Sequence, residues 1–228
     1  ILSDSGIINN KESQPSLLII EDNIELNSYL YSSFTPNYNC YDAKNGDIGL
    51  RIAQEYVPDL IICDVMMPGI DGFDVVKLLR KNEITSHIPI IILTAKGDNK
   101  SKLKSWQVYA DDYMTKPFNL IELTHRIENL LSIRNILKKK FGRNITDESI
   151  NSFIKNSTLP QRDKDFIEKF GGIIASNFEN PEFNRTIAAK KLAMSERQLN
   201  RKLSALIDYN FSNYLNKYRL SQSLKHTG

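Results

Sequence analysis

Short apolar runs alternate with amphipathic stretches over about 120 residues, and this alternation constrains the fold more than any other feature of the chain. Runs this short and this continuously apolar are typical of strands that are buried on both faces. A parallel sheet with helices on both sides provides such burial, so the pattern predicts an α/β fold with a doubly wound sheet. The expected strands are 17–20, 39–43, 60–65, 88–95 and 113–115, and the expected helices are 24–34, 46–56, 71–82, 98–108 and 118–135.

Composition limits what such a chain can be. The 228 residues are 41% hydrophobic and 25% charged, which is enough apolar material for a folded core. No apolar stretch approaches the ~18 residues of a membrane span. Two cysteines, Cys40 and Cys63, are too few for a disulfide scaffold, so we expect a reduced, cytoplasmic protein. The chain begins at Ile1 rather than at methionine, which predicts a piece of a longer protein with a linker remnant at 1–14.

Polar side chains stand where the predicted strands end. Glu21 and Asp22 follow the first strand, Asp64 ends the third, Thr94 the fourth and Lys116 the fifth. These side chains should converge, because the carboxyl ends of parallel strands meet at one edge of the sheet. Three carboxylates repel one another and need a cation, and oxygen ligands suit Mg²⁺. An ionised Asp64 beside Mg²⁺ could attack phosphorus, while Lys116 and the Thr94 hydroxyl bind the phosphoryl oxygens.

A simpler explanation exists for each of these residues taken alone. An acidic residue after a strand is commonly the N-cap of the next helix, and Asp22 by itself favours that role. Capping does not explain why five residues of suitable chemistry stand at four strand ends. The combination therefore favours a metal site that accepts a phosphoryl group.

Four blocks of this region resemble the signature blocks of bacterial response-regulator receiver domains, over about residues 16–135. The blocks are Leu17–Asn23 (LLIIEDN), Leu60–Gly72 (LIICDVMMPGIDG), Ile90–Ala95 (IIILTA) and Ala110–Phe118 (ADDYMTKPF). The resemblance implies a flavodoxin-like fold with a five-stranded sheet. It also implies that Asp64 is the phosphoacceptor.

The same resemblance implies roles for the residues around Asp64. Thr94 and Tyr113 match the family's switch pair, in which the threonine moves toward the phosphoryl group and the tyrosine turns inward behind it. An ordinary half-buried tyrosine is the alternative for Tyr113. The bond between Lys116 and Pro117 matches a family bond that is often cis. The implied Mg²⁺ ligands are Asp22, Asp64, the main-chain carbonyl of Met66 and, through water, Glu21.

The rest of the chain is predicted to be helical and carries the positive charge. Residues 1–130 have a net charge of −6 and residues 131–228 have +9, which together give the +3 of the whole chain. This asymmetry predicts different partners for the two halves, and a basic half favours a phosphate backbone. After a lysine-bearing connector over 136–162, the expected helices are 164–177, 184–192, 195–207 and 211–224.

Residues 186–206 (TIAAKKLAMSERQLNRKLSAL) have the pattern of a helix-turn-helix. Ser195 and Gln198 match a capping box at the start of the second helix. Its buried face is predicted to carry Leu199, Leu203 and Leu206.

The opposite face of the second helix carries Arg197 and Arg201, flanked by Asn200. Arginine and asparagine are the residue types that bind guanine and adenine edges in a major groove. A solvated helix face with surface arginines is an equally good interpretation of the local sequence. Because the capping box competes for Gln198, that residue is a weaker candidate for a base contact.

The segment from Phe166 to Leu224 resembles the first part of an AraC-type DNA-binding domain, a family with two helix-turn-helix units joined by a long helix. Residues 213–224 match the start of the joining helix, so a second unit is expected beyond Gly228. Ala193 and Asp208 replace two glycines that are usual in the family. The resemblance implies base contacts by Arg197, Asn200 and Arg201, and phosphate contacts by Lys190, Lys191, Lys202 and Lys217.

Together these features predict a phosphorylation-controlled transcription regulator. A histidine kinase would phosphorylate Asp64, and the basic domain would bind DNA, with a homodimer expected after phosphorylation. The expected order is a receiver at 15–135, a connector at 136–162 and a partial AraC-type domain at 163–228. This order resembles the C-terminal region of hybrid two-component sensors, so the parent protein is expected to be a hybrid histidine kinase anchored in the inner membrane, while the fragment itself is not expected to be an enzyme.

Two alternatives remain from the sequence. A phosphorelay receiver would pass phosphate onward without binding DNA, and the basic second half argues against it. A haloacid-dehalogenase-type hydrolase would use the same aspartate nucleophile. It would also need a second aspartate two residues later, where this chain has Met66.

Overall fold

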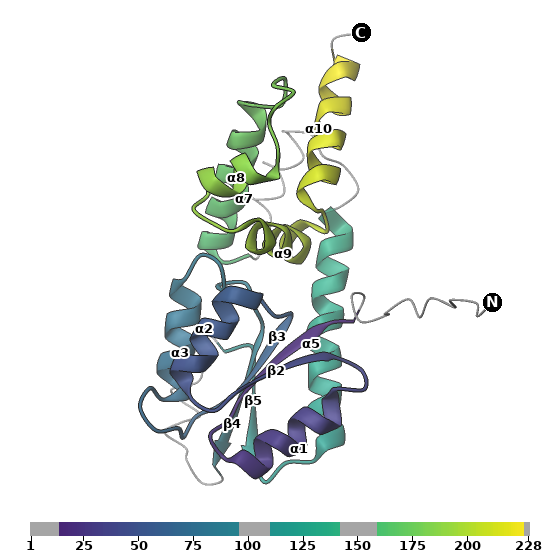
Figure 1. The fold of residues 1–228 in the computed structure, drawn as a ribbon. Coiled ribbons are helices and arrows are strands. Elements are labelled where there is room, and N and C mark those ends of the chain that lie inside the picture. Colours follow the sequence, from purple (N-terminus) through teal and green to yellow (C-terminus); the bar gives the residue numbers. More distant parts are fainter. Residues whose placement is uncertain (1–13, 96–109, 142–158, 226–228) are drawn as a thin grey trace, which may run out of the picture.

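The computed structural model describes residues 14–95, 110–141 and 159–225 (Figure 1). A five-stranded sheet has the order β2-β1-β3-β4-β5, and all neighbouring strands are parallel. Strand order reverses between β1 and β3, so a crevice opens beyond the carboxyl ends of these two strands. The strands are β1 (Ser16–Ile20), β2 (Asn39–Ala43), β3 (Leu60–Asp64), β4 (Ile90–Ala95) and β5 (Asp112–Lys116).

Helices cover both faces of the sheet, which confirms the predicted doubly wound fold (Figure 1). On one face Leu17 and Ile19 lie in a core with residues of two helices, α1 (Ile24–Phe34) and α5 (Leu120–Phe141). Leu18 and Ile20, which point the other way, lie in a core with residues of α2 (Gly46–Tyr56) and α3 (Gly72–Lys81). All five residues of β1 and of β3 are buried, which explains why residues 17–20 and 60–63 are continuously apolar.

The end of helix α5 differs from the sequence prediction. Helix α5 does not end at 135 but continues to Phe141, so the expected connector begins inside a helix. The physical reason is that no glycine or proline interrupts 136–141, and leucine and lysine are good helix formers. The expected helix at 98–108 lies outside the described residues.

The second half of the chain is a separate helical layer with an aromatic core. The ring of Phe170 lies 4.9 Å from that of Tyr214 and also contacts Phe166 and Phe211. These rings, with the leucines of the predicted buried face, form one hydrophobic cluster. The helices are α7 (Gln161–Ala175), α8 (Arg185–Lys191), α9 (Glu196–Ile207) and α10 (Phe211–Lys225).

Two non-glycine residues, one before α9 and one after it, have a left-handed backbone conformation. Ala193, in the turn after α8, has φ 53°, and Asp208, after α9, has φ 59°. These are the positions where the AraC-type resemblance implies glycine, so the chain keeps the backbone conformation without the residue that adopts it most easily. The predicted capping box is confirmed, because Ser195 and Gln198 bond to each other's backbone N–H groups.

Helix α9 lies between the receiver-like half and the other C-terminal helices (Figure 1). It contacts α2 and α5 at the end of the sheet where the strands begin. The carboxyl ends of the strands are at the opposite end of the molecule (Figure 1). Among the described helices, none is long and apolar enough to cross a membrane.

Candidate metal and phosphoryl site

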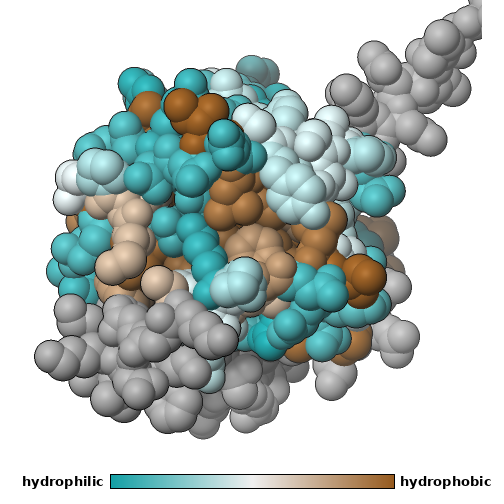
Figure 2. Space-filling view, turned by 90° about the horizontal axis from the view of Figure 1, so that it is seen from below, coloured by the Kyte–Doolittle hydropathy of each residue, from teal (hydrophilic) through white to brown (hydrophobic). Residues whose placement is uncertain are grey.

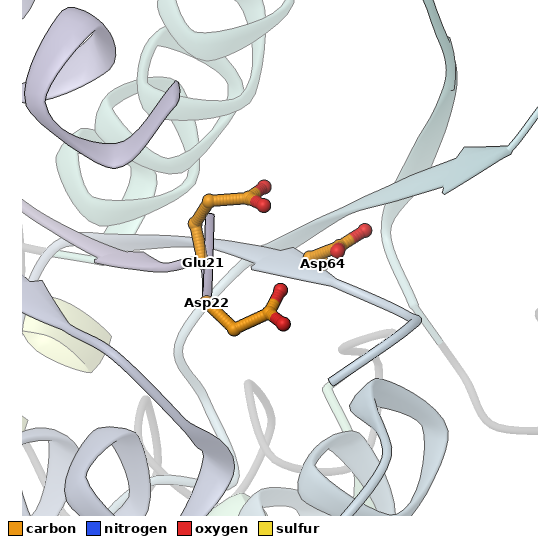
Figure 3. Close-up of side chains that lie close together, drawn as sticks. All are labelled: Glu21, Asp22 and Asp64. Atoms are coloured by element: carbon orange, nitrogen blue, oxygen red, sulfur yellow. The ribbon is translucent and has the colours of Figure 1, made fainter. Parts of the chain in front are cut away.

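Three carboxylates meet beyond the ends of β1 and β3. Oxygen atoms of Glu21, Asp22 and Asp64 lie within 4.8 Å of one another, and their side chains point toward a common space (Figure 3). The parallel pairing of Ile20 with Cys63 puts the two strand ends side by side. Glu21 and Asp64 are buried and Asp22 is half-buried. Their predicted convergence is therefore confirmed.

Asp22 does not cap the following helix. The N-cap of α1 is Asn23, whose Oδ1 accepts a hydrogen bond from the backbone N–H of Leu26 at 3.0 Å. The Asp22 carboxylate therefore stays in the acidic cluster, and the capping explanation fails for this residue.

Gly72, to which the sequence pattern assigns no role, brings α3 against the end of β3. A Cβ atom at this position would lie 2.1 Å from the backbone oxygen of Asp64, well inside van der Waals contact. The Gly72 N–H donates to the Val65 carbonyl at 3.0 Å. The sequence signal that could have indicated this contact is a glycine directly after the N-cap residue Asp71. Only a residue without a side chain permits this approach.

Lys116 joins the two buried carboxylates. Its Nζ donates to Glu21 Oε2 at 2.7 Å and lies 3.0 Å from Asp64 Oδ1. The Val65 N–H also donates to Asp64 Oδ1, at 2.9 Å. Both contacts therefore use the same oxygen, Oδ1. The Lys116–Pro117 bond is cis, in agreement with the family resemblance.

Among the residues that the structure describes, the charges at this end of the sheet do not balance. When ionised, three carboxylates face one ammonium group in this part of the chain. The pKa values of Asp64 and of Glu21 are both raised. Burial is the main cause, and the nearby ammonium group of Lys116 offsets only part of it. A divalent cation would supply the missing positive charge, and an all-oxygen donor set is the type that Mg²⁺ prefers. The residues present therefore fit Mg²⁺.

The hydroxyl of Thr94 is buried without a hydrogen-bond partner among the described residues. Thr94 is 1% exposed and is the last residue but one of β4, next to the strand that carries Lys116. An unpaired buried hydroxyl is costly, so a ligand oxygen at this point would relieve the cost. Tyr113 is half-buried against the core of β4, and its switch role stays a prediction. The same holds for the carbonyl of Met66, whose side chain is exposed.

The surface around this end is mixed in character. Figure 2 looks onto it from the side opposite the C-terminal helices, and hydrophilic residues lie there between hydrophobic ones. The carboxylate cluster is thus at an end of the molecule that the described C-terminal helices do not cover (Figure 1).

Two of the residues predicted to contact bases touch the receiver-like half, although Arg197 is exposed and Arg201 half-buried. The guanidinium of Arg197 lies 4.6 Å from the ring centroid of Tyr56, and Arg201 Nη1 lies 3.4 Å from Asp59 Oδ2. Asn200 Oδ1 accepts a hydrogen bond from the backbone N–H of Phe211, so it caps the next helix. Their base contacts stay predictions.

Lys202 corrects an expectation from the sequence. It was expected at a phosphate backbone, but it is fully buried beside Asp163, with their charged atoms 3.1 Å apart. In this arrangement Lys202 cannot contact DNA. The helical pattern offered a signal that the family resemblance overrode, because Lys202 lies beside Leu199 and Leu206 on the buried side of the helix.

Comparisons with known proteins agree with the geometry of the first half. The family model of the response regulator receiver domain matches residues 17–128. The response regulator receiver domain protein of Clostridium thermocellum has a TM-score of 0.51 and 27% identity, and the match covers 54% of this chain and 98% of that one.

Two longer matches extend beyond the receiver. "Histidine kinase P4" of Formosa agariphila is 31% identical over 223 residues, which are 97% of this chain and 16% of that protein. "Probable transcriptional regulator ycf29" of Pyropia yezoensis is 30% identical over 87% of this chain and 90% of its own length. The matches to three histidine kinases cover only 8–16% of the length of those proteins. From the receiver match and the near-complete coverage of a regulator, the chain belongs to the response regulator family, with its receiver domain at residues 17–128.

Proposed function

We propose that the chain is a phosphorylation-dependent transcription regulator. Asp64 would accept a phosphoryl group from a histidine kinase, and the basic helical half would bind DNA. The observation that carries the first part is the unbalanced cluster of three carboxylates and one lysine, with the unpaired Thr94 hydroxyl beside it.

Each residue of the cluster has a distinct part in this proposal. Asp64 Oδ2 would attack phosphorus, so that an O–P bond forms while the P–N bond to the kinase's histidine breaks and the histidine leaves. Lys116, already 3.0 Å from Oδ1, would bind a phosphoryl oxygen as it arrives. Thr94 donates its free hydroxyl to another phosphoryl oxygen. Asp22, Asp64 and the Met66 carbonyl would hold Mg²⁺, and Glu21 would act through water. The bound ion would offset the negative charge that builds up in the transition state.

DNA binding is proposed from the second half of the chain. A short turn with a left-handed residue joins α8 to α9, and α9 carries Arg197, Asn200 and Arg201. The positive charge of residues 131–228 favours a phosphate backbone. The long match to a protein named as a regulator of transcription supports the same assignment. The long match to a histidine kinase supports a hybrid parent in which kinase and regulator share one chain.

The test combines labelling with DNA binding. The chain is incubated with a small phosphodonor and Mg²⁺, and its intact mass is compared with that of Asp64→Asn and of Asp74→Asn, an exposed carboxylate paired with Lys77. We expect one phosphoryl group on the wild type and on the Asp74 variant, and none on the Asp64 variant.

Each species is then titrated with a labelled DNA duplex at two salt concentrations. Affinity that falls steeply with salt, and that falls further in Arg201→Ala, supports the DNA-binding half of the proposal. If Asp64 is labelled but the chain binds no duplex, either with or without the phosphoryl group, the phosphorelay alternative replaces the DNA-binding proposal.

A further inference from the structure

The first six residues of α9 include five polar side chains, and the structure divides them into two groups. Glu196, Gln198 and Asn200 accept hydrogen bonds from other residues of the helical half of the chain. The two arginines, Arg197 and Arg201, instead contact the receiver-like half. This division decides which of the five side chains are available to the base edges of DNA.

The Glu196 carboxylate joins α9 to α8. Its Oε1 accepts a hydrogen bond from the Thr186 hydroxyl at 2.5 Å, and its Oε2 accepts one from Arg185 Nε at 2.6 Å. Both oxygens therefore have donors within the helical half. A carboxylate contacts bases by accepting from the N4 amino group of cytosine, and these two bonds turn Glu196 away from that role.

Gln198 and Asn200 also use their side-chain oxygens inside the helical half. Gln198 Oε1 accepts from the backbone N–H of Ser195 at 2.8 Å, and Asn200 Oδ1 accepts from that of Phe211 at 3.1 Å. Recognition of adenine by glutamine or asparagine is bidentate, because the oxygen accepts from N6 while the amide nitrogen donates to N7. An oxygen that is turned to the protein backbone does not face a base, so neither residue is available for adenine.

The contacts of the two arginines lie outside the helical half. Arg197 is exposed and covers the ring of Tyr56, and Arg201 Nη1 lies 3.4 Å from Asp59 Oδ2. Releasing these contacts breaks none of the bonds that hold α9 to α8 and α10. Residues four apart lie on the same face of a helix, about 6 Å apart along its axis. Both guanidinium groups can therefore enter one groove together.

A guanidinium group selects guanine among the four bases. It carries only donors, and the guanine edge in the major groove offers two neighbouring acceptors, N7 and O6. Adenine has an amino donor in place of O6, which would oppose the guanidinium group.

We propose that α9 selects duplexes in which two guanines stand within two base-pair steps of each other, one for Arg197 and one for Arg201. The spacing follows from the helix, because about 6 Å along its axis corresponds to about two steps of roughly 3.4 Å. This inference rests on the proposed DNA binding and names the class of duplex that the chain binds.

The test is a selection from a pool of duplexes with a randomised central segment. The chain is mixed with the pool at low salt, and the bound duplexes are recovered and sequenced. We expect the guanine pair to be enriched. Replacing either guanine in an enriched duplex should lower the affinity about tenfold.

Three variants assign the guanines to side chains. Arg201→Gln should replace one enriched guanine by adenine, because glutamine offers one acceptor and one donor. Asn200→Asp keeps an oxygen for the Phe211 N–H but removes the amide donor, so it should leave the enriched bases unchanged. Arg51→Gln is the control, because it removes the same charge from an exposed position of α2 and should also leave them unchanged.

The outcomes separate this inference from the proposed function. Bound duplexes without enriched guanines would overturn the inference while DNA binding stands. Enriched bases that change in Asn200→Asp, or that stay the same in Arg201→Gln, would do so as well. Recovery of no duplex above the background without protein would remove the proposed function, and this inference with it.

Discussion

Two lysines stand at opposite ends of the molecule, each against buried carboxylates. Lys116 is 24% exposed and faces Glu21 and Asp64, with Asp22 close by. Lys202 is fully buried and faces one carboxylate, Asp163. The first cluster has an excess of negative charge and an open side, and the second has equal charges and neutral donors around them.

The difference separates a binding site from a structural contact. A buried pair with matched charges needs no further ion, so it holds two surfaces together, even though Asp163 Oδ2 has no hydrogen-bond partner among the described residues. A cluster with unmatched charge is complete only when a cation or an incoming group supplies the difference. Charge balance at each lysine therefore indicates its role more clearly than the presence of the ion pair does.

The largest expected effect comes from breaking the balanced pair. Lys202→Met should destabilise the chain by about 3–5 kcal/mol, because it leaves the charge of Asp163 buried alone. Asp163→Leu/Lys202→Met should recover most of this loss, since no charge remains. Urea unfolding followed by circular dichroism measures both variants. Equal losses in the single and the double variant would show that the pair is not the source of the stability.

Gly72→Ala tests the close contact between α3 and the end of β3, beside the acidic cluster. The new Cβ would overlap the Asp64 backbone, so we expect a loss of about 1–3 kcal/mol together with slower labelling of Asp64. Gly171→Ala is the matched control, because a Cβ there meets no atom within 4 Å. That control should be neutral or slightly stabilising in its helix. A Gly72 variant as stable as the control would contradict the close approach.

Removing negative charge from the unbalanced cluster should weaken Mg²⁺ binding. Asp22→Ala should lower the affinity at least about tenfold, which corresponds to about 1.4 kcal/mol. Glu21→Ala should lower it less, because Lys116 already holds the Glu21 carboxylate. Isothermal titration calorimetry gives both constants, with Asp74→Ala as the control. An Asp22 variant that binds Mg²⁺ like the wild type would exclude it as a direct ligand.

The smallest expected effect concerns the turn before α9. Ala193 is exposed and left-handed at φ 53°, so Ala193→Gly should stabilise the helical half by about 1 kcal/mol. Asp208→Gly should gain less, since aspartate tolerates this conformation better. Thermal unfolding measures both. Destabilisation by Ala193→Gly would mean that the left-handed turn is not present in solution.

The sequence was sufficient for the sheet and for the acidic cluster. Leu17–Ile20 and Leu60–Asp64 are apolar at every position before the acidic end because both faces are covered, so their strands and the convergence of their ends follow from pattern alone. The end of α5 was missed because nothing at residue 135 stops a helix.

The docked position of α9 could not be predicted from the sequence. An arginine on the polar face of a helix has the same sequence pattern whether it faces water, DNA or another domain. Only the contact between Arg201 and Asp59 in the structure shows which of these Arg201 faces. The position of Lys202 beside Leu199 and Leu206 did indicate burial, but its partners Asp163 and Ser86 are distant in sequence. Partners far apart along the chain leave no local pattern.

One measurement tests the contrast between the two clusters most directly. Wild type, Asp64→Asn and Asp163→Asn are treated with a small phosphodonor and Mg²⁺, and peptide mapping by mass spectrometry locates the label. We expect a single phosphoryl group on the peptide that contains Asp64, in the wild type and in Asp163→Asn alike, and no label in Asp64→Asn. Label that persists in Asp64→Asn, or that maps to any other carboxylate, would contradict the assignment of the unbalanced cluster as the phosphoryl-accepting site.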